Sequence, residues 1–65
     1  MKMRFIKLTE MAYTNDERYF NVDKIENFKR MIASTYLYMS TSNTAFEVME
    51  TPEEIIQLIK QAEEI

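Results

Sequence analysis

The run Thr51-Pro52-Glu53-Glu54 constrains this chain more than any other segment, because it specifies a sharp helix start. The Thr51 hydroxyl can accept a hydrogen bond from the N–H of Glu54, and the Glu54 carboxylate can accept one from the N–H of Thr51. Pro52 falls at the first helical position, where its missing N–H costs nothing. Two acidic residues in the first turn also suit the positive end of the helix dipole. We therefore predict a helix that begins directly after Thr51.

Apolar residues follow this start at helical spacing. The predicted stripe consists of Ile55, Leu58, Ile59 and Ala62, and Ile56 widens it. One face of the helix should therefore pack on the rest of the chain, with its polar residues in water.

The segments before Thr51 are mainly typical of strands. Residues 4–8 place Ile6 and Leu8 on one face, and residues 18–22 direct Phe20 and Val22 to a core. The polar run 14–17 between them is typical of a turn. We expect these two strands to form a first hairpin.

A second hairpin is predicted around Ser42-Asn43. With those two residues as the loop, Met39 pairs with Phe46 and Leu37 with Val48 on one apolar face. Tyr38 then opposes Glu47 and Tyr36 opposes Met49 on the other face. Since the chain has no glycine, a slightly longer loop is also compatible with this pattern.

Residues 23–34 fit two structures. If the segment is a helix, Asp23 is its N-cap, Glu26 completes a capping box, and Ile25, Phe28 and Ile32 share a stripe. As a strand, Phe28 and Ile32 still share a face. The hairpin that follows favours a short turn at 23–25 and then a strand.

These elements predict an α+β fold, in which a small antiparallel sheet of about four to five strands is closed by one C-terminal helix. The 65 residues form a single domain, with a β-rich body at 1–50 and the helix at 51–65. A chain this short buries only about 60% of its unfolded surface. It has no Cys or His for a disulfide or a zinc site, yet 46% of its residues are hydrophobic. We therefore expect self-association to hide part of that surface.

Several short motifs occur in a familiar order. They are Ile6-Lys7-Leu8-Thr9, Asn21-Val22-Asp23-Lys24-Ile25, an alternating strand pair, and the run from Glu47 to Ile56. In this order the chain resembles very small bacterial and phage proteins of the flagellar and swarming-motility FlbD type. The resemblance implies the same fold. It assigns Asn21 and Asp23 no catalytic role, and we interpret both as turn-formers. Relatives usually carry an Asn-Gly turn where this chain has Ser42-Asn43, which favours a phage, prophage or plasmid origin over a flagellar role.

Composition excludes most catalytic machinery. Without His or Cys there is no Ser-His or Cys-His pair, and without Gly there is no phosphate-cradling loop. The pairs Glu53 with Glu54 and Glu63 with Glu64 are adjacent in a helix, so their carboxylates diverge by about 100°. We therefore predict no enzyme activity, no catalytic residue, no metal site and no cofactor.

Tyrosine and methionine give the strongest indication of binding. Tyr36 and Tyr38 share the strand face turned away from the core, with Met49 beside Tyr36, and Tyr13 and Tyr19 are candidates to border the same surface. Tyr and Met are enriched where proteins meet proteins. If the helix or the first hairpin covers this face, the same residues belong to the core instead. We predict Tyr36, Tyr38, Met49, Tyr19 and Tyr13 as protein-interface residues.

Charge narrows the class of partner. The net charge is −3 and no basic stripe is present, which disfavours direct nucleic-acid binding.

No signal peptide and no apolar run of membrane-spanning length is visible, so we expect a cytoplasmic protein.

The predicted function is a non-catalytic protein-binding or adaptor module that binds a host protein, another copy of itself, or both. A phage-encoded inhibitor of a host defence protein is one form of this function. The alternatives are a small regulator acting at nucleic acid or on motility genes, and small-molecule sequestration by an oligomer.

Overall fold

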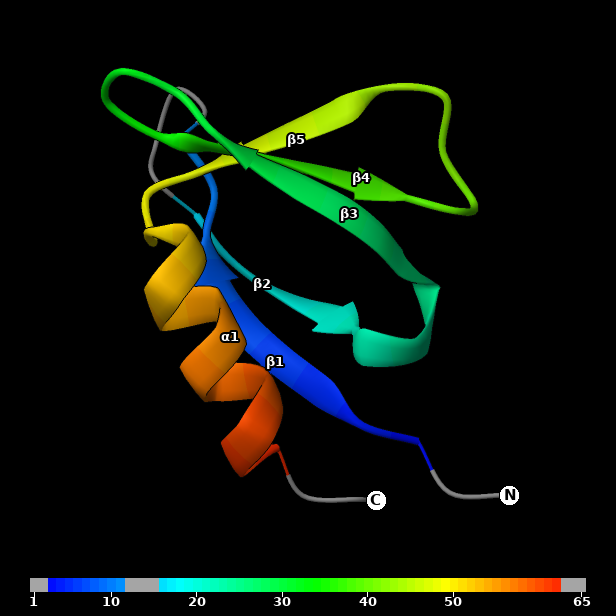
Figure 1. Cartoon of the computed structure of the whole chain (residues 1–65). Helices are drawn as coiled ribbons and strands as arrows, with labels where there is room; N and C mark the ends of the chain where they lie inside the picture. The colour runs from blue at the N-terminus through cyan, green and yellow to red at the C-terminus, as the bar shows by residue number, and fades with distance from the viewer. Residues whose placement is uncertain (1–2, 12–15, 63–65) are drawn as a thin grey trace.

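The computed structural model describes residues 3–11 and 16–62. In chain order they form β1 (Phe5–Thr9), β2 (Glu17–Asn21), the 3-10 helix η1 (Val22–Lys24), β3 (Ile25–Arg30), β4 (Thr35–Met39), β5 (Ala45–Val48) and α1 (Pro52–Gln61). Figure 1 shows β3, β4 and β5 as one layer, with β1, β2 and α1 on the same side of it. The α+β class and the C-terminal helix agree with the sequence prediction.

The prediction of one sheet closed by the helix is wrong. The described strands form a two-stranded sheet, β1-β2, and a three-stranded sheet, β3-β4-β5, both antiparallel, and the assembly stays open. The chain turns through η1 between β2 and β3, where the Asn21 side chain accepts a hydrogen bond from the Asp23 N–H at 3.0 Å. Because this turn takes β3 away from β2, the two strands belong to different sheets.

The two sheets are joined at one corner, just beyond the end of β1. Glu10 forms an isolated antiparallel bridge with Val48. The Met11 N–H donates to the Glu47 carbonyl at 2.8 Å, and the Met49 N–H donates to the Thr9 carbonyl at 2.9 Å. The chain after β1 therefore crosses from one sheet to the edge of the other.

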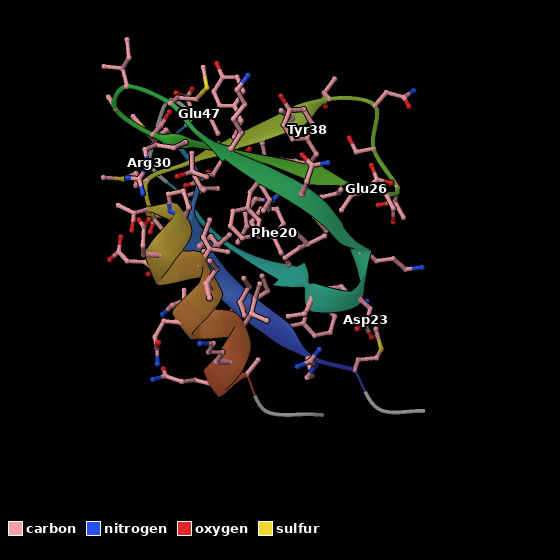
Figure 2. All side chains as sticks on the ribbon, viewed as in Figure 1. Phe20, Asp23, Glu26, Arg30, Tyr38 and Glu47 are labelled. Carbon is pink, nitrogen blue, oxygen red and sulfur yellow. The ribbon has the colours of Figure 1, made fainter. Side chains whose placement is uncertain are left out.

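The core lies between the two sheets and the helix. Its buried residues are Ile6, Leu8, Phe20, Leu37, Met39, Val48 and Ile55. Figure 2 shows Phe20 between the layers, and its ring meets the Phe46 ring edge to face, with centroids 5.4 Å apart. The inward-facing residues predicted for the two strands of the first hairpin are confirmed, since Ile6, Leu8 and Phe20 are buried and Val22 packs against them.

The ambiguous segment is a short turn followed by a strand. Residues 22–24 form η1, and β3 then pairs with β4, placing Phe28 opposite Leu37. A bulge lies between Ile25 and Asn27. The strand interpretation is therefore confirmed for residues 25–30 only. Residues 31–34 connect β3 to β4, and Ile32, which was expected to share a face with Phe28, is fully exposed.

The second hairpin has the predicted faces and a different register. Leu37 lies opposite Phe46 rather than Val48, Tyr38 opposite Ala45, and Tyr36 opposite Glu47. The register differs by two residues, so each side chain keeps its face. Residues 40–44 form the connection, inside which the Thr44 N–H donates to the Ser42 hydroxyl at 3.3 Å. A five-residue connection does not require the two-residue turn for which glycine is preferred.

The helix start is confirmed in detail. The Glu54 N–H donates to the Thr51 hydroxyl at 3.1 Å, and the Thr51 N–H donates to the Glu54 carboxylate at 2.8 Å. Ile55 is fully buried. Ile56 is 45% exposed, so the expectation that it widens the packed stripe is wrong. The helix contacts β1 and β3, which leaves the far face of the three-stranded sheet free of α1.

Candidate functional site

The far face of the three-stranded sheet is the candidate site, and we call it the outer face. In β4, Thr35, Leu37 and Met39 are buried, while Tyr36 and Tyr38 alternate with them and are half-buried. Figure 2 shows Tyr38 and Glu47 on the side of the sheet away from Phe20. No element of the described chain lies on this side in Figure 1.

Strand register arranges the outer face in rows. In the first row Asn27, Tyr38 and Ala45 lie side by side, and in the second Lys29, Tyr36 and Glu47 do. Directly opposite side chains in antiparallel strands lie about 4.5–5.5 Å apart at their Cβ atoms. Tyr36 is thus flanked by a cation on one side and an anion on the other.

Three further residues lie just beyond the strand ends, at one end of the sheet. The Met31 N–H donates to the Ser34 carbonyl at 2.8 Å, and the buried Ser34 hydroxyl donates to the Glu47 carboxylate at 2.6 Å. Met31 is 36% exposed and Met49 is 51% exposed. The outer face therefore has two tyrosines at its centre, with the Glu47 side chain oriented by Ser34, and two accessible methionines lie beyond its end.

The structure brings together only part of the predicted interface. Tyr36 and Tyr38 lie on the outer face, as the sequence indicated. Met49 follows the end of β5 and is not the neighbour of Tyr36, a position that Glu47 takes. Tyr19 lies on β2 opposite Lys7, in the two-stranded sheet, and is 70% exposed. Tyr13 lies outside the described residues. Tyr19 is therefore an exposed tyrosine on a different sheet from the one that carries the outer face.

Lys29 and Glu47 complete the outer face, and the sequence pattern did not single them out. Each depends on strand pairing between β3, β4 and β5, which a single strand pattern does not fix. The alternation of residues 27 and 29 along the strand expected after residue 25 was the available signal.

Glu53 and Glu54 have separate partners and do not form a common site. Glu54 caps α1, whereas Glu53 forms an ion pair with Arg30 at the end of β3. The hydrogen bond from Arg30 lowers the pKa of the Glu53 carboxyl from its ordinary value. Glu63 and Glu64 lie outside the described residues. Within residues 3–11 and 16–62 no group of three or more acidic, His or Cys side chains is placed to hold a metal ion.

A cavity of about 220 Å³ lies where the 31–34 turn meets the start of α1. Met31, Ala33, Met49 and Pro52 provide apolar lining, and Thr35 also borders it. The Thr35 hydroxyl is buried and has no hydrogen-bond partner among the described residues. The cavity is smaller than the roughly 300–1,000 Å³ of typical small-molecule sites. Its methionines are the ones at the end of the outer face.

Comparison of the chain with protein-family models, with curated proteins and with solved structures finds no match. In the part of the chain that the structure describes, no helix has both the length and the apolar character needed to cross a membrane.

Proposed function

We propose that this protein is a non-catalytic protein-binding module and that the outer face is its binding surface. The observation that carries the proposal is the adjacent pair Tyr36 and Tyr38 on a sheet face that no described element covers. Aromatic residues and Met are enriched at protein interfaces and supply much of the binding free energy.

The surroundings of the tyrosines support a protein partner. Lys29 and Glu47 supply one charge of each sign beside Tyr36, and the accessible Met31 and Met49 lie beyond the end of the face. A nucleic-acid surface would instead need clustered cations along a groove. The net charge of −3 is unfavourable for that alternative.

The finer parts of this proposal come from the sequence. They are a cytoplasmic location, a host protein as partner, and inhibition of a host defence protein by a phage-encoded or other mobile-element protein. The resemblance to proteins of the FlbD type stays a prediction.

The test is capture of host proteins by the immobilised chain and by matched glutamate variants. Tyr36→Glu and Tyr38→Glu place a charge on the outer face, whereas Tyr19→Glu makes the same change on the two-stranded sheet. We expect both outer-face variants to lose a protein that wild type and Tyr19→Glu retain. Equal recovery of every captured protein by all four chains would contradict the proposal, provided that far-UV circular dichroism shows each variant folded.

A further inference from the structure

We infer that the outer face binds a second copy of this chain, with the two three-stranded sheets stacked face to face about a two-fold axis parallel to β4. This inference rests on the proposed function, because it names an occupant of the same surface. Its basis is the symmetry of the charges and side chains that the strand register creates.

The charges are complementary under this axis. A two-fold rotation about a line parallel to β4 keeps each residue in its row and places β3 of one copy over β5 of the other. Lys29 of one copy then lies over Glu47 of its partner, and Glu47 lies over the partner's Lys29. Since such an interface is isologous, the favourable pair occurs twice.

The uncharged positions match under the same operation. Tyr36 and Tyr38 on the central strand meet their own counterparts, and Asn27 of one copy lies over Ala45 of the other. Face-to-face sheets pack about 10 Å apart, which side chains from both faces fill. The two half-buried tyrosines would thereby lose contact with water.

The alternative axis is unfavourable. A two-fold axis that crosses the strands at the row of Tyr36 places β3 over β3 and β5 over β5. Lys29 would then face Lys29 and Glu47 would face Glu47, which is repulsive at both ends of the row. The pattern of charges therefore favours the parallel axis, which alone of these two places Lys29 over Glu47.

The size of the face predicts a weak dimer. Three strands over the five-residue length of β4 cover roughly 240 Å² at a strand spacing of about 4.8 Å and a rise of about 3.3 Å per residue. A stable interface of standard size buries about 800 Å² on each partner. We therefore expect reversible association with a dissociation constant on the order of 10 µM to 1 mM.

Reciprocal charge reversal tests the arrangement. Sedimentation equilibrium of the full chain is compared with that of Lys29→Glu, of Glu47→Lys and of their equimolar mixture. Each variant alone should dimerise about tenfold more weakly, because two attractive pairs become repulsive. In the mixture, the acid introduced at position 29 meets the lysine introduced at position 47, and the native Glu47 meets the native Lys29. The mixture should therefore recover wild-type association.

Lys60→Glu is the matched control, since it changes the net charge equally at an exposed position on α1. It should associate as wild type does. If Glu47→Lys fails to fold after losing the Ser34 hydrogen bond, the salt dependence of dimerisation is measured instead of the mixture. Added salt should weaken the wild-type dimer and strengthen that of Lys29→Glu, because screening removes attraction in one and repulsion in the other.

Three results would overturn the inference: a monomer up to about 1 mM, equal association by Lys29→Glu and Lys60→Glu, or a mixture of folded variants no better than either alone. Failure of the inference is distinguishable from failure of the proposed function. A monomer that loses a captured host protein on Tyr36→Glu refutes only the second copy as occupant. A dimer that captures no host protein refutes only the host partner.

Discussion

The Glu50 carboxylate accepts hydrogen bonds from both the backbone N–H and the side-chain hydroxyl of Thr9, which lies 41 positions earlier in the chain. The distances are 2.9 and 3.1 Å. The same Thr9 carbonyl accepts a hydrogen bond from the Met49 N–H at 2.9 Å. The N–H and the carbonyl of Thr9 therefore both form hydrogen bonds at the corner where the chain passes from β1 toward β5.

Removing this acceptor should destabilise the corner. Glu50→Ala leaves the part-buried N–H of Thr9 without its partner, which should lower the free energy of unfolding by about 1–3 kcal/mol. Urea unfolding followed by circular dichroism measures the change. Glu50→Gln keeps one acceptor oxygen and should lose less. Unfolding curves of Glu50→Ala that superimpose on wild type would show that water replaces the carboxylate.

Adjacent isoleucines on α1 should respond differently to the same substitution. Ile55 is fully buried, so Ile55→Ala should cost about 2–5 kcal/mol through lost burial and a cavity. Ile56 is 45% exposed, so Ile56→Ala should stay within about 0.5 kcal/mol of wild type. Thermal or urea unfolding of the two variants tests the orientation of the helix. Equal losses would mean that Ile56 also packs against the sheets.

The capping box gives a third prediction. Thr51→Ala removes the acceptor for the Glu54 N–H and should cost about 1 kcal/mol. Thr51→Ser retains the hydroxyl and serves as the control. A melting temperature for Thr51→Ala identical to that of Thr51→Ser would contradict a role for the hydroxyl in starting α1.

The Arg30–Glu53 ion pair should contribute to stability in a pH-dependent manner. Its hydrogen bond lowers the pKa of Glu53, so the contribution is present at neutral pH and is lost as the pH falls through that lowered pKa. Both side chains are largely exposed, so the effect should be small. Glu53→Gln should melt slightly below wild type at neutral pH, and the gap should close in acid. Arg30→Gln should show the same closure, whereas a gap independent of pH would exclude the ion pair as its cause.

Local chemistry made several parts of this fold predictable. The capping box, Pro52 and the apolar spacing at Ile55 and Leu58 defined α1 because all their partners lie within one or two turns. Alternation likewise identified which residues of β1, β2 and β4 face inward, since a strand directs neighbouring side chains to opposite sides.

Tertiary structure decided what depends on distant partners. Register between β4 and β5 is set by the five-residue connection 40–44, and a shift of two residues leaves the pattern of faces unchanged, so the sequence alone could not distinguish Glu47 from Met49 as the neighbour of Tyr36. The division into two sheets depends on the turn at η1, and their connection depends on the Glu10–Val48 bridge, whose residues are far apart in the chain. The row Lys29, Tyr36 and Glu47 exists only once three strands are aligned. The sequence therefore determined which residues could face outward, and only strand pairing decided which of them became neighbours, because pairing depends on contacts between distant segments rather than on local periodicity.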